Sequence, residues 1–321
     1  MLLVLAVLFI GCSVFVENFL SWRNMQGLAL AVTTIGMVAC TMLFCLAAGD
    51  FDLSIGSVVA CAGVLGAVVM TRTDSIALGI LAALGLGAAS GFVNGFVVAR
   101  MKINALITTL ATMQIVRGLG FIISDGKAVG IGQEGFFVLG NSAFLGVPTP
   151  VWITAACFIV FGFILNRTVF GRDTLAVGGN AEAAHLAGIP VERIKIAIFT
   201  VQGVMAAFAG VVLASRMTSG QPNAGLGFEL EVISACVLGG VSLTGGPGCV
   251  GEVGVSSRPH AASGSAEASM KASMVVFTVV RCIELDSFPE SDHCKAHATA
   301  TCSAGVRVFL ARCSVTGDDE A

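Results

Sequence analysis

The sequence predicts an all-α, polytopic helical membrane protein with about eight membrane elements and an aberrant polar C-terminal tail. Charged residues make up only 12% of the chain and hydrophobic residues 56%, whereas soluble domains carry about 25% charged residues. Long charge-free apolar runs recur up to residue 251. The chain also has 40 glycines against 7 prolines, and small residues let membrane helices approach closely.

Each expected membrane element is an apolar run close to the roughly 20 residues that a helix needs to cross a bilayer. The run 1–16 is read as a first membrane helix because it lacks the basic segment and cleavage site of a signal peptide. The other long runs are 24–49, 53–71, 75–99, the C-terminal part of 135–166, 196–215 and 232–251. The run 103–116 is short and is followed by Arg117, so we expect a broken or re-entrant segment there.

Basic residues orient these elements, because cytoplasmic loops are enriched in Lys and Arg. Arg100 and Lys102 form one basic turn. A second basic segment carries Arg167, Arg172, Arg193 and Lys195. Two spans separate the two segments, so both are expected on the cytoplasmic side.

A polar island, residues 166–195, separates two apolar runs and contains a short helix at 181–187. Asn180 is a suitable N-cap, and Glu182 lies in the first turn, where the helix dipole favours a negative charge. Gly188 and Pro190 end the helix. Its small apolar face needs a packing partner.

Glycines repeat every fourth residue at Gly87, Gly91 and Gly95 in an apolar run. This spacing indicates close contact between two helices. A contact within one chain is favoured over a contact between subunits.

Two groups of polar residues are candidates for a transport pathway. Asp50, Asp52 and Ser54 lie between two spans, where a carboxylate either caps the next helix or lines a polar pathway. Polar side chains also follow the run 103–116, where they either meet sugar hydroxyls or bond neighbouring helices. They are Asn104, Thr108, Thr109, Thr112 and Gln114.

Several kinds of site are not supported. The sequence has no G-x-x-x-x-G-K-[ST] motif, so it does not bind ATP through a P-loop. His293, Cys294, His297 and Cys302 do not have the spacing of a common zinc site, so no metal site is expected. A net charge of −3 gives no indication of nucleic-acid binding.

Four motifs occur in the order found in one known family. They are Gly-Asp-Phe-Asp-Leu-Ser at 49–54, Asn-Ala-Leu-Ile-Thr-Thr-Leu-Ala-Thr-Met at 104–113, Gly-Gly-Asn-Ala-Glu-Ala-Ala-His-Leu-Ala-Gly-Ile at 178–189 and Ala-Cys-Val-Leu-Gly-Gly at 235–240. With these motifs, residues 1–248 resemble the ribose/xylose/arabinose-type ABC sugar permeases. The stretches 103–118, 124–130 and 214–222 are most similar to members that carry L-arabinose.

The resemblance implies the membrane subunit of a monosaccharide importer in the bacterial inner membrane, and not an enzyme. It implies a permease homodimer, a separate ATPase subunit that binds ATP and Mg, and a periplasmic sugar-binding protein. The loop 166–195 would couple to the ATPase. The coupling residues would be Asn180, Glu182, Ala183, Ala184, Leu186, Ala187 and Gly188.

Residues 249–321 depart from the family, which continues with apolar spans. We interpret this polar, poorly periodic segment as an out-of-frame or spliced tail. Two other functions stay open. One is a truncated remnant that binds the ATPase without transport, and the other is an ion-coupled secondary sugar transporter using Asp50 and Asp52.

Overall fold

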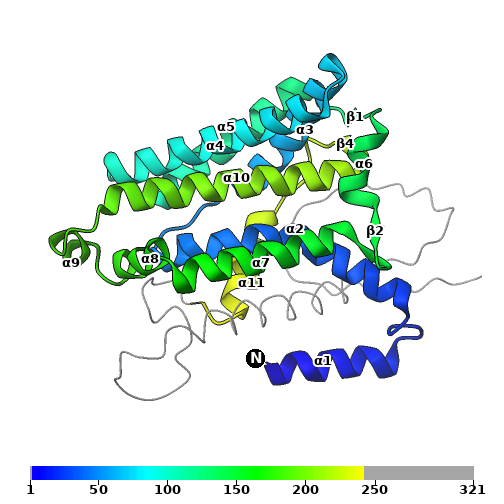
Figure 1. Ribbon diagram of the computed structural model, residues 1–321, viewed down its shortest axis with the longest axis horizontal. Coiled ribbons are helices and arrows are strands. Elements are labelled where there is room, and N and C mark those ends of the chain that lie inside the picture. The colour runs from blue at the N-terminus through cyan, green and yellow to red at the C-terminus, as the bar shows by residue number, and fades with distance from the viewer. Residues whose placement is uncertain (1, 242–321) are drawn as a thin grey trace, which may run out of the picture.

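The computed structural model describes residues 2–241, which fold mainly into α-helices (Figure 1). Six of these helices are apolar and long enough to cross a membrane. They are α2 (Trp22–Ala47), α3 (Ile55–Thr73), α4 (Ile76–Arg100), α5 (Ala105–Ser124), α7 (Thr149–Arg167) and α10 (Val191–Met217). The all-α membrane class is confirmed, whereas about eight membrane elements was an overcount for this part of the chain.

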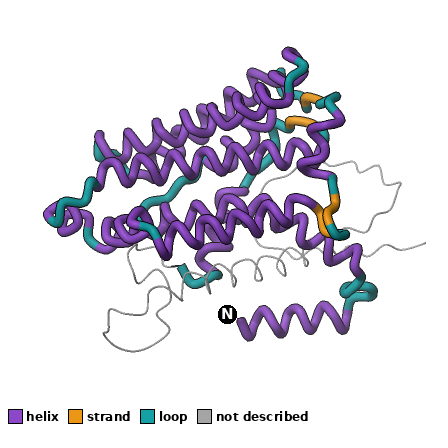
Figure 2. The backbone as a smooth tube through the Cα atoms, viewed as in Figure 1, coloured by secondary structure: helices purple, strands orange, loops and turns teal. Residues whose placement is uncertain are grey.

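Shorter elements connect or flank these spans. The short helices are α1 (Leu2–Phe15), α6 (Glu134–Asn141), α8 (Val169–Gly179), α9 (Ala181–Leu186) and α11 (Phe228–Leu238). Strand β1 (Val129–Gly130) pairs antiparallel with β4 (Ser219–Gly220), and β2 (Ala143–Phe144) pairs with β3 (Val147–Pro148). Both strand pairs lie at the end of the bundle opposite α8 and α9 (Figure 2).

Three sequence-based expectations about membrane elements change. The run 1–16 forms α1, which has only 14 residues, and the run 232–251 contributes to α11, which has 11. Residues 242–251, the predicted tail 249–321 and the His293–Cys302 region lie outside the described residues. The prediction of a break in 103–116 is wrong, because α5 is continuous for 20 residues and passes through Arg117.

The core is built around α2 and α10. Every residue of α2 from Val32 to Ala47 is buried, because α2 packs against α7, α10 and α11. A helix that is apolar on all sides is either buried among other elements or faces lipid, and α2 is buried. In Figure 1, α10 runs between α2 and the pair formed by α4 and α5.

The glycine repeat of α4 forms a contact within the chain, as the sequence favoured. A Cβ atom on Gly91 would lie 2.2 Å from the carbonyl oxygen of Phe199 on α10, closer than real Cβ atoms approach. Gly87 and Gly95 meet α10 in the same way. Only glycine allows α4 and α10 to approach this closely.

Two irregular segments turn back into the bundle. Val59, in the second turn of α3, abuts Gly210, in the last third of α10. α3 therefore begins beside the C-terminal part of α10 and not beside its N-terminus. Residues 48–54 therefore run along the bundle before α3 begins (Figure 1). Residues 221–227 return from β4, and the carbonyl of Gly225 abuts Gly56 at the start of α3. Segment 221–227 thus meets the start of α3 inside the protein.

Candidate functional site

The basic residues predicted on one side of the membrane come together at one end of the bundle. α4 and α7 end there and α10 begins there. The guanidinium of Arg100 forms an ion pair with Glu192, with 2.6 Å between Nη1 and Oε2. We call this end the basic end, and the positive-inside rule predicts that it is cytoplasmic. It carries Arg100, Lys102, Arg167, Arg172, Arg193 and Lys195.

Helix α9 lies at the basic end and has the predicted caps (Figure 1). The side-chain oxygen of Asn180 accepts hydrogen bonds from the backbone N–H groups of Glu182, at 3.0 Å, and Ala183, at 2.9 Å. Gly188 has φ +86°, a left-handed conformation that suits glycine, and turns the chain into Pro190. The observed helix ends at residue 186, one residue before the predicted end.

Most of the surface of α9 is open. Leu186 is 83% exposed, and Ala183 and Ala187 are also exposed. Among the predicted coupling residues only Ala184 is buried, so its side chain seats α9 on the rest of the chain. Ala183, Leu186 and Ala187 therefore form an exposed apolar face on α9, and its coupling role stays a prediction.

Helix α8 was not predicted, because the sequence before Asn180 was interpreted only as a polar island. The hydroxyl of Thr168 accepts a hydrogen bond from the backbone N–H of Gly171 at 3.3 Å and caps α8. Gly171, Thr174 and Val177 are buried at helical spacing. A threonine followed by this i, i+3 pattern was the signal available in the sequence.

A cavity of about 1080 Å³ opens between α9, the start of α10 and the α4–α5 connection. This volume is slightly above the roughly 300–1,000 Å³ typical of small-molecule pockets. Predicted pathway residues Asp50 and Asn104 line it, together with the coupling residue Glu182. Lys102 and Lys195 also line it, so charged side chains of both signs border the space beside α9.

A second ion pair lies beside this cavity. Nζ of Lys195, on α10, lies 2.7 Å from Oδ2 of Asp50, in the α2–α3 connection. The side chains are 20% and 13% exposed, whereas those of Arg100 and Glu192 are 65% and 49% exposed. The sequence placed Lys195 on the cytoplasmic side but did not identify it as the partner of Asp50.

A buried polar network connects the α2–α3 segment to α4 and α5. Oδ1 of Asp52 accepts hydrogen bonds from the N–H group of Ser54, at 2.9 Å, and from its hydroxyl, at 2.6 Å. The Ser54 hydroxyl accepts one from Nδ2 of Asn94 at 3.0 Å, and Oδ1 of Asn94 accepts one from Thr112 at 2.6 Å. Asn94 is fully buried and was not among the predicted site residues. An amide in the middle of a glycine-rich apolar helix was the available signal.

The remaining predicted pathway residues are not brought together. Thr108 and Thr109 are buried and donate to the carbonyls of Asn104 and Leu106 in their own chain segment. Gln114 is exposed on the outer face of α5. The side chain of Asn104 caps α5 by accepting a hydrogen bond from the N–H of Leu106 at 2.9 Å.

Arg117 explains how α5 continues through a charged residue. Its guanidinium donates to the carbonyl oxygens of Pro222, Ala224 and Gly225, at 3.2, 2.7 and 3.2 Å. These carbonyls belong to the segment 221–227, which is not helical. Backbone groups of this kind need partners within the protein when the surroundings are lipid. Arg117 is therefore a structural contact that the sequence analysis missed.

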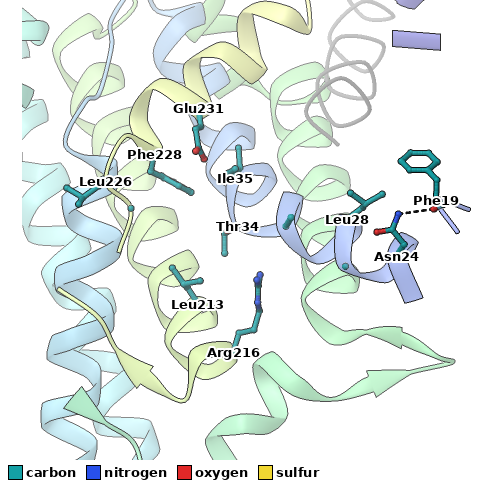
Figure 3. A pocket seen from close by; sticks show the side chains of 13 residues that line it. Phe19, Asn24, Leu28, Thr34, Ile35, Leu213, Arg216, Leu226, Phe228 and Glu231 are labelled. Atoms are coloured by element: carbon teal, nitrogen blue, oxygen red, sulfur yellow. Dashed lines mark hydrogen bonds between the residues drawn. The ribbon is translucent and has the colours of Figure 1, made fainter. Parts of the chain in front are cut away.

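A further cavity of about 440 Å³ lies between α2, α10 and the start of α11 (Figure 3). Asn24, Thr34, Arg216 and Glu231 provide polar groups in its lining. Figure 3 shows Arg216 and Glu231 on opposite sides of the cavity. Nη1 of Arg216 also donates to the carbonyl of Leu30 at 3.0 Å. The sequence analysis assigned no site to this region.

Known proteins show clear similarity to the chain. Residues 24–277 match the family described as "Branched-chain amino acid transport system / permease component". The L-arabinose transport system permease protein AraH of Escherichia coli (strain K12) is 64% identical over 253 residues, which cover 79% of this chain and 77% of that protein. The L-arabinose ABC transporter permease protein AraH of Azospirillum brasilense is 56% identical over 244 residues, 76% of this chain and 72% of that protein.

The ribose import permease protein RbsC of Escherichia coli (strain K12) is 37% identical over 253 residues, which cover 77% of this chain and 78% of that protein. No solved structure matches the chain. The family match extends past residue 248, so a tail that begins at 249 stays a prediction. These relatives are named as transport permeases, which supports an importer over an ion-coupled transporter. The chain belongs to this permease family of ABC transporters and is a multi-pass membrane subunit, not an enzyme.

Proposed function

We propose that the chain is the permease subunit of a binding-protein-dependent ABC importer that carries L-arabinose. The observation that carries the proposal is 64% identity to an L-arabinose permease, against 37% to a ribose permease. A separate ATPase subunit would bind ATP and Mg²⁺. A periplasmic sugar-binding protein would deliver the monosaccharide to the permease.

Helix α9 is the proposed docking element for the ATPase. Asn180 and Gly188 fix its two ends, so that the docking surface is a preformed helix rather than a flexible loop. Exposed Leu186 would be the apolar anchor, with Ala183 and Ala187 beside it. Glu182 would add a charge at the rim of the contact.

A second copy of the chain is the proposed neighbour of α5. Much of α5 faces outward, and Gln114 presents an exposed amide there. Lipid offers no hydrogen-bond partners to an amide. A pathway between two copies would supply water or sugar hydroxyls to Gln114. The cavity lined by Asp50 and Asn104 would serve as the cytoplasmic exit.

Uptake of labelled L-arabinose tests the proposal in cells that supply the ATPase and the binding protein. We expect uptake that is lost on deletion of the ATPase, persists with an uncoupler while ATP is maintained, and is competed better by unlabelled L-arabinose than by ribose. Cells without the permease are the control. Uptake that collapses with the proton gradient would contradict ATP-driven import. Preferred competition by ribose would contradict the assigned sugar.

A further inference from the structure

We propose that the Lys195–Asp50 ion pair is a positioning contact that transmits movement of α9 to the buried network of Asp52, Ser54, Asn94 and Thr112. The inference rests on the proposed function, because it takes α9 as the element on which the ATPase acts. Nζ of Lys195 lies 2.7 Å from Oδ2 of Asp50. The pair joins the start of α10 to the α2–α3 segment, and both segments line the same cavity.

The connection from α9 to Lys195 is short and well ordered. The N–H of Ile189 donates to the carbonyl of Ala184 at 3.0 Å, which locks the turn after α9 to the helix itself. α10 begins at Val191, and Lys195 follows in its second turn. A displacement of α9 therefore reaches Lys195 through one tight turn and one helical turn.

The connection from Asp50 onward is equally short. A single residue separates Asp50 from Asp52 in the irregular segment 48–54. The buried carboxylate of Asp52 is held by the N–H and hydroxyl of Ser54, the residue immediately before α3. Asn94 on α4 joins this hydroxyl to Thr112 on α5. Moving Asp50 therefore shifts the point at which α3, α4 and α5 are tied together.

Burial distinguishes this ion pair from its neighbour. The Lys195 and Asp50 side chains are mostly buried, so water and salt screen their attraction only partly. Arg100 and Glu192 form an exposed pair at the same end of the bundle, and exposed pairs contribute little. The Arg100–Glu192 pair is therefore a matched control for loss of an ion pair at the basic end.

The test uses the permease reconstituted with its ATPase and binding protein, with sugar uptake and ATP hydrolysis measured together. Asp50→Asn and Lys195→Gln should each lower uptake per ATP hydrolysed about tenfold, an effect within the range of coupling between directly interacting residues. Co-purification of the ATPase should be retained in both. Exchanging the charges in the double variant Asp50→Lys, Lys195→Asp should recover most of the lost uptake per ATP. Arg100→Gln should leave the ratio unchanged.

Three outcomes would overturn the inference. An unchanged ratio of uptake to hydrolysis in both single variants would show that the pair transmits nothing. If uptake per ATP falls in the single variants and is not recovered in the exchanged variant, Asp50 would instead have a direct role toward the sugar. If Lys195→Gln no longer co-purifies with the ATPase, the ion pair would contribute to docking of the ATPase and not to transmission of its movement. Wild-type permease without ATP-dependent uptake would instead contradict the proposed function, and is therefore a separate result. If Asp50→Asn fails to reach the membrane, Lys195→Gln and the exchanged variant still test the same contact.

Discussion

Nη1 of Arg117 lies 2.7 Å from the carbonyl oxygen of Ala224, so a membrane helix holds the backbone of a segment that turns back into the bundle. The same guanidinium reaches the carbonyls of Pro222 and Gly225. Its planar fork can serve several acceptors at once, which a lysine ammonium at the end of a flexible stem does less well. Arg117 therefore fixes where segment 221–227 lies relative to α5.

Replacing Arg117 should destabilise the permease even when the charge is kept. We expect Arg117→Lys to lower the free energy of unfolding by about 1.5–3 kcal/mol, the typical contribution of a hydrogen bond to a charged group. Arg117→Met should lower the free energy of unfolding by more, because all three carbonyls lose their donor. Thermal unfolding of the purified protein measures both. Equal stability of Arg117→Lys and the wild type would show that positive charge alone is sufficient.

The Asn94 amide should be essential to the buried polar network. Asn94→Leu removes the donor to Ser54 and the acceptor for Thr112, so two hydroxyls lose a partner inside the protein. Leaving buried polar groups unsatisfied costs about 1–3 kcal/mol each. We expect a clear drop in unfolding temperature.

Thr200→Val is the control for Asn94→Leu. The Thr200 hydroxyl donates only to the carbonyl of Ile196 in its own helix, at 2.7 Å. That carbonyl belongs to the regular helix, so loss of the hydroxyl should change stability by less than about 0.5 kcal/mol. If the two variants unfold at the same temperature, the network does not stabilise the fold.

The α4–α10 contact should tolerate no added atom at its glycines. Gly91→Ala places a Cβ atom 2.2 Å from the carbonyl oxygen of Phe199, so the two helices must separate. Overpacking of this kind costs about 1–3 kcal/mol. Gly85→Ala, on the same helix, meets nothing within 4 Å and should be neutral or stabilising. Identical unfolding temperatures for the two alanine variants would contradict the packing seen between α4 and α10.

Much of the fold could be predicted because most helices are marked by residues within their own stretch of sequence. Five of the six long helices overlap the predicted charge-free runs, and Asn180 and Gly188 mark α9 through their own capping chemistry. α5 was misjudged because Arg117 is acceptable in a membrane helix only through carbonyls more than a hundred residues away. No local pattern contains that information.

The candidate site was predicted less completely, because its contacts are between distant segments. Asp50 and Asp52 were identified as unusual carboxylates, but a capping role and a pathway role could not be separated from the sequence. The structure gives them different partners, Lys195 for Asp50 and Ser54 for Asp52. Asn94 was missed because one amide in an apolar run has no spacing pattern that identifies its partners.

Gly188 should be required for coupling through its backbone conformation. Its φ of +86° disfavours any residue with a Cβ atom, and β-branched valine in particular. Gly188→Val should cost about 1–3 kcal/mol locally, which will redirect or unwind α9. We expect weaker co-purification with the ATPase and lower sugar uptake.

Gly126→Val is the matched control for Gly188→Val. Gly126 also has positive φ, +68°, and both glycines have nothing within 4 Å of an added Cβ. It lies between α5 and β1, and β1 is at the end of the bundle opposite α9 (Figure 1), so the same backbone strain is introduced far from the proposed docking element. Gly126→Val should lower thermal stability to a similar extent while leaving co-purification with the ATPase intact. If both variants weaken co-purification equally, general destabilisation explains the effect, and α9 loses its assigned role in coupling.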